Sequence, residues 1–226
     1  MDWAATATDL IALQQELAAA MPDPWQPGIE PPHIGGCFVC FGRGGDGPGA
    51  PGDRGWAAAS ILQRGELIAA ASASGRTPAG YEAGLLALRE GPLLESAVRA
   101  LPFLPDVLLV NATGRDHPRR AGLALHLGAV LDIPTVGATP RTLVGPGNWP
   151  EDATGATSPI ELDGEIAGYW VRTRAGTRPL VAHAAWRASA STAATVLLLA
   201  CRGARTPEPI REARRVAREA RAADHA

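Results

Sequence analysis

The chain has 226 residues, of which 46% are hydrophobic, and a formal net charge of −2. This length can bury one large core and no proline- and serine-rich linker divides the chain, so we expect a single domain over residues 1–226. No apolar run approaches the length of a membrane span, and the start of the chain carries Asp2, Asp9 and Glu16 rather than basic residues. These features exclude the membrane-spanning and secretory classes and favour the cytoplasm.

Every one of the 21 basic residues is an arginine. A slightly negative chain lacks the overall basic charge that is usual in nucleic-acid binding. Arginines nevertheless cluster over residues 115–120 with Arg141, and again over residues 202–221. Local charge can attract phosphate where net charge does not. For residues 202–221 the sequence favours a solvated helix, because Glu212 and Glu219 lie among the arginines.

The predicted elements alternate between helix and strand. Residues 8–20 predict an amphipathic helix, residues 34–41 a buried strand, and residues 56–63 and 66–72 a hairpin that turns at Arg64–Gly65. The Gly/Pro-rich segment 42–55 lacks the lysine and spacing of a phosphate-binding loop, which favours a hairpin tip. Later helices are expected at residues 82–99, 118–131, 189–201 and 207–222, and later strands at residues 106–111, 133–137, 165–173 and 179–183. This order predicts an α/β fold with a mixed sheet.

The segment from Asn111 to Gly128 carries most of the functional information. A short apolar run ends at Asn111, a turn with Gly114 follows, and Pro118 stands where a helix could start. A strand that ends in this way delivers its last side chain to a cleft. Here that side chain is a neutral amide, whereas hydrolytic metal chemistry requires a carboxylate that can hold a hard cation.

The motifs and their order along the chain resemble the endonuclease V family. Residues 111–128 resemble the nuclease segment of that family, including its His-Pro-Arg at His117, and the resemblance covers roughly residues 8–222. The other matching segments are 34–41 (the first strand), 81–93 (the base-wedge loop and the following helix), 133–137 (the fifth strand), 166–174, 178–182 and 205–211. An ordered set of this kind is more specific than any single motif.

This resemblance implies a fold and an activity. The fold would be a ribonuclease H-like mixed sheet flanked by helices. The family cleaves DNA, or RNA in some members, beside deaminated bases such as hypoxanthine, in a Mg²⁺-dependent reaction of DNA repair. The implied partners are therefore DNA or RNA strands that contain deaminated bases, while the oligomeric state stays open.

The family's metal-ligand positions are mostly substituted. The resemblance places an aspartate of the first strand at Phe38, a glutamate of the following helix at Glu90, and an aspartate ending the fourth strand at Asn111. Clustered carboxylates would bind Mg²⁺ and stabilise charge on the phosphate. Only Glu90 keeps its carboxylate; Asn111 offers a neutral oxygen and Phe38 offers none. We expect these three residues to converge at one end of the sheet and to bind Mg²⁺ weakly or not at all.

Two further positions of the family are also replaced. Its lysine after the fifth strand falls at Pro140, although Arg141 beside it could supply a cation with a different reach. Its last histidine falls at Trp186. His117 keeps a family position and, with Glu90 and Asn111, completes the candidate catalytic set.

A rebuilt metal site could instead use Asp116, His117, His183, Cys37 and Cys40. Cysteines three apart on a strand face opposite sides and no second CxxC exists, so packing cysteines are favoured over ligands. With Cys201 they form an odd and sparse set that gives no disulfide framework. A Ser/His/Asp hydrolase built from Ser158, His183 and Asp163 lacks the spacing of a nucleophile elbow.

The recognition frame implied by the resemblance is better preserved. Tyr81 matches the wedge aromatic that fills the gap left by an extruded base, and we expect it in an exposed loop. Two prolines of the wedge motif are replaced by Gly80 and Ala83, which raises the entropy cost of ordering the loop. The candidate nucleic-acid-binding residues are Tyr81, Gly84, Gly114, Arg119, Gly137 and Arg141.

Three hypotheses follow. The first is a catalytically impaired relative that still binds nucleic acid. The second is an active deoxyinosine endonuclease that uses Glu90, Asn111 and water-mediated Mg²⁺ coordination, because Mg²⁺ keeps several waters and sometimes needs only one or two carboxylates. The third is a protein-interaction module on the same scaffold. Metal-dependent cleavage and binding to inosine-containing strands would separate them.

Overall fold

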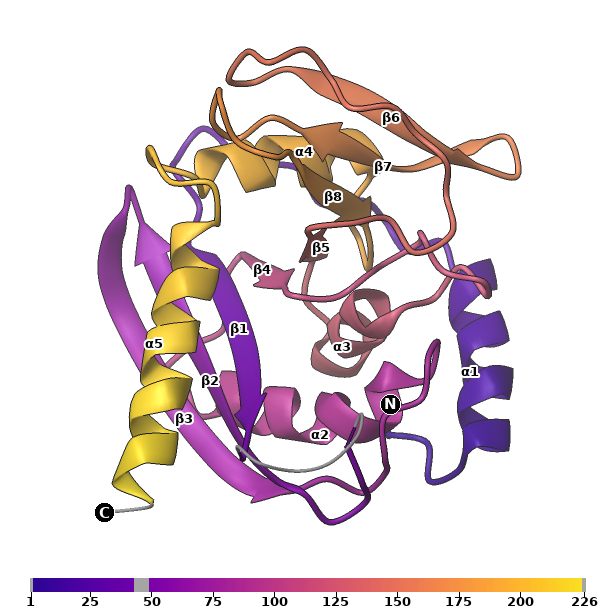
Figure 1. The fold of residues 1–226 in the computed structure, drawn as a ribbon, viewed down its shortest axis with the longest axis vertical. Coiled ribbons are helices and arrows are strands. Elements are labelled where there is room, and N and C mark those ends of the chain that lie inside the picture. The colour runs from indigo at the N-terminus through magenta and orange to yellow at the C-terminus, as the bar shows by residue number, and fades with distance from the viewer. Residues whose placement is uncertain (1, 43–48, 225–226) are drawn as a thin grey trace.

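The computed structural model describes residues 2–42 and 49–224, and part of the Gly/Pro-rich segment 42–55 lies outside these residues. The chain forms a mixed eight-stranded sheet in the order β3-β2-β1-β4-β5-β8-β7-β6, with helices packed against it (Figure 1). The strands are β1 (Ile34–Phe41), β2 (Arg54–Gln63), β3 (Glu66–Arg76), β4 (Val107–Val110), β5 (Thr135–Thr139), β6 (Thr157–Leu162), β7 (Glu165–Val171) and β8 (Leu180–Ala184). The helices are α1 (Ala7–Ala19), α2 (Leu86–Arg99), α3 (Leu123–Leu131), α4 (Ala190–Leu199) and α5 (Glu208–Ala223).

The first three strands form an antiparallel meander, as the sequence predicts. The hairpin between β2 and β3 turns at Arg64 and Gly65, whose φ angles of 52° and 81° are both positive. Two successive positive φ angles match the twist of a two-residue hairpin. The predicted turn is therefore confirmed.

The second half of the sheet combines parallel and antiparallel pairing. β1, β4 and β5 run parallel, and β8, β7 and β6 extend the sheet in antiparallel order. The edge strand β6 was not predicted. Its sequence contains Pro159 and most of its residues are at least partly exposed, which is tolerated at an edge because one side of the strand needs no partner.

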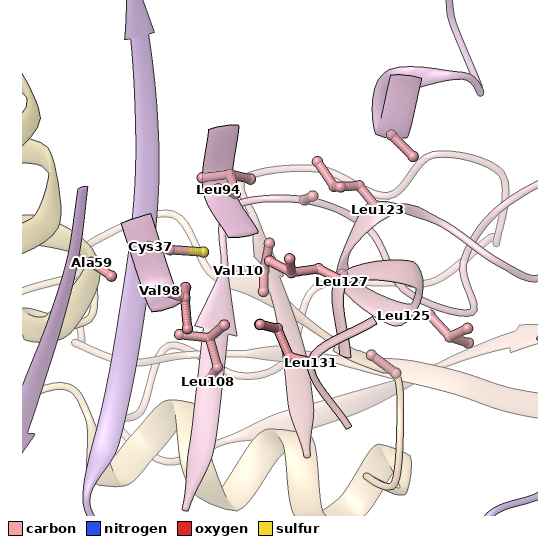
Figure 2. Close-up of a cluster of buried hydrophobic side chains, with 14 of the residues drawn as sticks. Cys37, Ala59, Leu94, Val98, Leu108, Val110, Leu123, Leu125, Leu127 and Leu131 are labelled. Atoms are coloured by element: carbon pink, nitrogen blue, oxygen red, sulfur yellow. The ribbon is translucent and has the colours of Figure 1, made fainter. Parts of the chain in front are cut away.

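Helices cover both faces of the sheet (Figure 1). α1, α2 and α3 pack on one face, which we call the α2 face, around a leucine-rich cluster that includes Leu94, Leu108 and Leu127 (Figure 2). α4 and α5 pack on the opposite face, called here the α5 face. Among the described residues, no helix combines the length and apolar character that crossing a bilayer requires.

The two central helices begin later than predicted. α2 starts at Leu86 rather than at residue 82, because Gly84 has a left-handed backbone with φ of +80°. α3 starts at Leu123 rather than at Pro118, after the extended residue Gly122. Arg120, with φ of +57°, breaks any helix that Pro118 could have started. Both shifts lengthen the loops that border the cleft described below.

The cysteines pack as the sequence predicts. Cys37 belongs to the cluster on the α2 face, whereas Cys40 packs with Trp56 and Ala217 on the α5 face. Strand alternation turns the two thiols away from each other. The expectation that they are packing residues on opposite faces is therefore confirmed.

Candidate functional site

A cleft of about 460 Å³ opens on the α2 face, where β4 and β5 end. Its walls come from the loop before α2, the segment after β4, the segment after β5, and α1. The lining side chains used below are those of Gln14, Tyr81, Asn111, His117, Thr139 and Arg141. A smaller, mostly apolar hollow of about 240 Å³ lies elsewhere, beside Arg64 and Pro209, and contains none of the predicted site residues.

Asn111 follows β4 directly and is exposed to the cleft. Gly114 and Gly137 lie close by and let backbone segments approach each other. A Cβ atom at Gly114 would lie 2.1 Å from the carbonyl oxygen of Ala184, and one at Gly137 would lie 2.4 Å from that of Ala112. Neither glycine lines the cleft itself. Their role is to allow the close packing that shapes the region around Asn111.

Tyr81 stands at the mouth of the cleft with 49% of its surface exposed. The predicted exposed position is therefore confirmed. Its backbone N–H donates to the carbonyl of Gly49 at 3.2 Å, which ties the loop to the segment before β2. The ring is free to stack on a planar partner, because only part of it is covered by protein.

The carbonyl oxygen of Gly84 accepts three hydrogen bonds. The donors are Nε2 of Gln14 at 3.0 Å, Nε2 of His117 at 3.1 Å and Nη2 of Arg119 at 2.9 Å. Arg119 also donates through Nε to the side-chain oxygen of Gln14. Gln14 lies on α1 and was not predicted as a site residue. It is buried on a helix whose pattern indicates only a packing face, so the sequence offers no signal for it.

His117 is a neutral, hydrogen-bonded residue. Burial lowers its pKa to about 4, and the nearby Arg119 guanidinium acts in the same direction. Nδ1 of His117 accepts from the backbone N–H of Arg119 at 3.2 Å, so Nε2 carries the proton that it donates to Gly84. Both ring nitrogens are thus occupied by protein groups, which favours a structural role over acid–base catalysis.

Asp116 and His183 lie close together in the interior, next to the loop that follows β5. Both side chains are 0% exposed, and Oδ2 of Asp116 lies 3.7 Å from Nδ1 of His183. Asp116 accepts hydrogen bonds from the backbone N–H groups of Leu143, Val144 and Gly145 at 2.7, 3.0 and 2.7 Å. Burial lowers the pKa of His183, although the charge of Asp116 opposes the shift. The carboxylate is already committed to protein donors.

We predict that the free energy of unfolding falls as pH drops from 6.5 towards 4. Burial lowers the pKa of His117 and His126 to about 4 and also lowers that of His183. Between pH 6.5 and 4, these histidines are therefore protonated in the unfolded chain but remain neutral in the folded chain. Glu90 acts oppositely: burial raises its pKa to about 7, so its stabilising contribution is complete below pH 4.5 and is lost as pH rises through 7.

On unfolding in this pH range the three histidines take up protons and Glu90 releases one, so the chain binds protons overall. Each net proton changes stability by about 1.4 kcal/mol per pH unit. Urea unfolding at pH 6.5, 5.5 and 4.5 measures the slope. His126→Leu should reduce it by about one proton, because the fully buried His126 ring, 4.4 Å from the Trp3 ring between centroids, has its pKa lowered to about 4 by burial. A stability that stays level from pH 6.5 to 4.5 would contradict the prediction.

Glu90 lies on α2, partly buried behind the cleft rather than lining it. Burial raises the pKa of its carboxyl to about 7, while Arg89 opposes the shift. Its charge in turn contributes to the raised pKa of the Cys37 thiol, after the larger effect of burial. The β1 side chain that interacts electrostatically with Glu90 is therefore Cys37, one residue before the predicted position 38.

Phe38 lies on the opposite face of the sheet. Its ring packs beside Cys40 and α5, and the Arg214 guanidinium carbon lies 4.9 Å from the ring centroid. The expectation that Phe38 would converge with Glu90 and Asn111 is therefore wrong for Phe38. The physical reason is strand alternation: Cys37 faces α2, so Phe38 must face α5.

The donors do not fit a hard divalent cation. Over residues 2–42 and 49–224, no group of three or more His, Cys, Asp and Glu side chains could hold a metal ion. Of the three family positions, Glu90 alone keeps a carboxyl, whose pKa burial raises, and Asn111 presents a neutral amide. Mg²⁺ needs oxygen ligands in near-octahedral geometry and is bound through carboxylates. The alternative metal site of Asp116, His117, His183, Cys37 and Cys40 likewise does not form among the described residues, because these side chains do not cluster.

The remaining substituted positions take structural places. Pro140 and Arg141 are exposed just after β5, and Arg141 lines the cleft. Trp186 is half-buried against the α2-face cluster, and its Cβ abuts the helix position Gly128. Thr139 lines the cleft between these groups, and no sequence motif had pointed to it.

The comparisons with known proteins agree with this architecture. The family model described as endonuclease V matches residues 46–215. An endonuclease V from Haloarcula marismortui is 36% identical over 210 residues, covering 85% of this chain and 74% of the relative. The chain spans 54 to 60% of the length of several other curated relatives.

Solved structures show the same fold. The crystal structure of endonuclease V from Streptomyces avermitilis has a TM-score of 0.87 and 29% identity, covering 99% of this chain and 96% of that chain. A Ciona intestinalis endonuclease V, solved with a 24mer DNA containing an inosine, has a TM-score of 0.76 at 21% identity and covers 94% and 96%. The sheet and its flanking helices form a ribonuclease H-like fold, and the chain belongs to the endonuclease V family.

Proposed function

We propose that this chain binds a nucleic-acid strand with an extruded deaminated base in the Tyr81–Asn111 cleft and hydrolyses it poorly or not at all. One observation carries the proposal. The exposed Tyr81 and the cleft beside it are present, whereas the described residues contain no cluster of three or more His, Cys, Asp and Glu side chains that could hold a catalytic cation. Recognition and hydrolysis depend on different residues, so one can persist without the other.

The chemistry of the cleft suits a planar, polar ligand. An exposed aromatic ring such as Tyr81 stacks on any base. Asn111 offers hydrogen-bonding groups for a base edge, and the exposed Arg141 offers a positive charge for phosphate. Arg119 is assigned a supporting role instead, because its guanidinium is bonded to Gly84 and Gln14. Gly84, Gly114 and Gly137 would shape the pocket.

The comparisons support the ligand class. The Ciona intestinalis relative was crystallised with inosine-containing DNA, and the present chain has the exposed Tyr81 beside its own cleft. The proposal extends that ligand class to this chain. Whether the natural strand is DNA or RNA follows from comparing the two in the binding test below.

The loss of charge is the reason to propose weak metal binding. Asn111 removes one negative charge relative to the family pattern, and position 38 brings none to the cleft because Phe38 lies on the far face of the sheet. Mg²⁺, when bound in such sites, supplies Lewis-acid stabilisation of the phosphate and activation of water. Among the described residues that line the cleft, Glu82 in the loop before α2 brings the one carboxylate, whereas Glu90 lies behind the cleft.

Fluorescence anisotropy in EDTA tests the proposal. Labelled strands that differ only in one inosine or one guanosine, as DNA and as RNA, are titrated with the protein. We expect tighter binding of an inosine strand without any metal. Equal affinities for inosine and guanosine strands would favour a protein-interaction module, and inosine preference that requires Mg²⁺ would favour a minimal active site.

A further inference from the structure

The short segment Arg115–Arg119 lies between the two walls of the cleft. One wall, called here the wedge wall, is formed by residues 81–84. The other, called the 139–145 loop, follows β5. Asp116 of this segment contacts the 139–145 loop, whereas His117 and Arg119 contact the wedge wall.

Asp116 holds the 139–145 loop. Its fully buried carboxylate accepts from three consecutive backbone N–H groups, those of Leu143, Val144 and Gly145. A buried carboxylate is costly unless its oxygens are satisfied, so these contacts depend on each other. Consecutive N–H groups that converge on one anion also require a defined loop conformation. The loop is thus fixed at the point where Leu143 lines the cleft.

Thr139 and His183 extend this support to the start of the loop. Nε2 of His183 lies 2.7 Å from Oγ1 of Thr139, and the Thr139 hydroxyl donates to the carbonyl of Arg141 at 2.6 Å. Because the hydroxyl proton goes to Arg141, the Thr139 oxygen accepts from His183. Thr139 and Arg141 both line the cleft, so the contacts reach its surface.

His117 and Arg119 hold the wedge wall through the carbonyl of Gly84. This wall lacks the two prolines that the family pattern would provide, since Gly80 and Ala83 stand in their places. Prolines stiffen a loop by reducing the conformational freedom of the unfolded chain. Here hydrogen bonds from His117, Arg119 and Gln14 to the Gly84 carbonyl supply that order instead.

We propose that Asp116, His117 and Arg119 form a two-sided clamp that fixes the separation of the wedge wall and the 139–145 loop, so that the cleft admits one planar base of the size of hypoxanthine and excludes bases with larger ring systems. They act as positioning residues that determine specificity. The specificity part of this inference rests on the proposed function, whereas the clamp itself is a property of the folded chain.

Amide hydrogen exchange without nucleic acid tests the clamp directly. Asp116→Asn replaces an acceptor-only group by an amide that cannot accept all three N–H groups. We expect exchange at Leu143–Gly145 to accelerate by about tenfold or more, while the core strands stay protected. Arg119→Leu should accelerate exchange at Leu85 and its neighbours in the same way. Unchanged exchange in both variants would overturn the clamp.

Two further variants keep the test decisive. Thr139→Val loosens the 139–145 loop through a partly exposed residue if Asp116→Asn does not fold, and it should accelerate exchange at residues 141–145.

Ala83→Pro in the Arg119→Leu background should restore protection of the wedge wall, since proline supplies the lost order. Arg120→Leu is the matched control, because Arg120 bonds to Leu162 and Glu165 outside the cleft. Faster exchange at either wall in Arg120→Leu would contradict the assignment.

Binding then tests specificity. Strands carrying inosine or 1,N6-ethenoadenine, whose fused ring is larger, are titrated by anisotropy. We expect the wild type and Arg120→Leu to prefer the inosine strand. Asp116→Asn and Arg119→Leu should lose most of that preference. Adding Ala83→Pro to Arg119→Leu should restore the preference. An unchanged preference ratio would overturn the specificity role. Altered exchange without inosine binding by the wild type would retain the clamp and reject the proposed function.

Discussion

Wild-type protein at micromolar concentration should leave inosine-containing DNA essentially uncut in Mg²⁺ or Mn²⁺. Removing one well-placed stabilising group commonly costs about 10² to 10³ in rate. Here Asn111 replaces one carboxylate, position 38 faces away from the cleft, and the pKa of the surviving Glu90 is raised by burial to about 7. Because poor metal binding adds to the loss of transition-state stabilisation, the two effects multiply. Strand scission is measured on denaturing gels.

The controls for this prediction use the remaining carboxylate and the two substituted positions. Glu90→Ala should change nothing, since no activity depends on it. Phe38→Asp with Asn111→Asp should also stay inactive, because Phe38 lies on the α5 face beside Arg214. Metal-dependent scission by the wild type that disappears in Glu90→Ala would show that a minimal site works. Scission gained by the double variant would show that position 38 still reaches the cleft.

Tyr81→Ala should weaken binding of an inosine-containing strand by about 5- to 150-fold, since stacking of one base on an aromatic ring is worth about 1 to 3 kcal/mol. The ring is 49% exposed at the mouth of the cleft, so its removal costs little packing. Anisotropy titration in EDTA gives the ratio of dissociation constants, and unfolding in urea confirms that stability is retained.

Two matched variants separate stacking from general effects. Tyr81→Phe keeps the ring and should bind within about twofold of the wild type. Phe103→Ala removes another exposed aromatic, one that contacts His33 and does not line the cleft, and should leave affinity unchanged. Equal affinity of Tyr81→Ala and wild type would remove Tyr81 from the binding surface.

Much of the sheet could be predicted because its strands are short apolar runs separated by strong turn signals. The first strand and the hairpin at Arg64–Gly65 follow from such patterns. β6 escaped prediction because it is an exposed edge with Pro159; its only signal was the turn Asp163–Gly164, whose φ angles of 54° and 79° form a hairpin with β7. An exposed edge strand buries few apolar side chains, so its sequence shows little of the alternating apolar pattern by which strands are predicted.

The candidate site was predicted less completely, because a motif identifies residues but not where their side chains point. Tyr81, Asn111 and Arg141 do line one cleft. The position of Phe38 depends on which face of β1 it occupies, and a shift of one residue reverses the face. Gln14 and Asp116 depend on contacts between segments far apart in the chain, for which local sequence carries no signal.

The central claim is that recognition of a deaminated base persists while metal-dependent hydrolysis does not. The most direct measurement titrates one labelled inosine strand and its guanosine counterpart in Mn²⁺ and in EDTA, and recovers the strands from the same samples on a denaturing gel. We predict the same inosine preference in both conditions, with intact strands throughout. Inosine preference that appears only with Mn²⁺ and is accompanied by scission, or no preference in either condition, would contradict it.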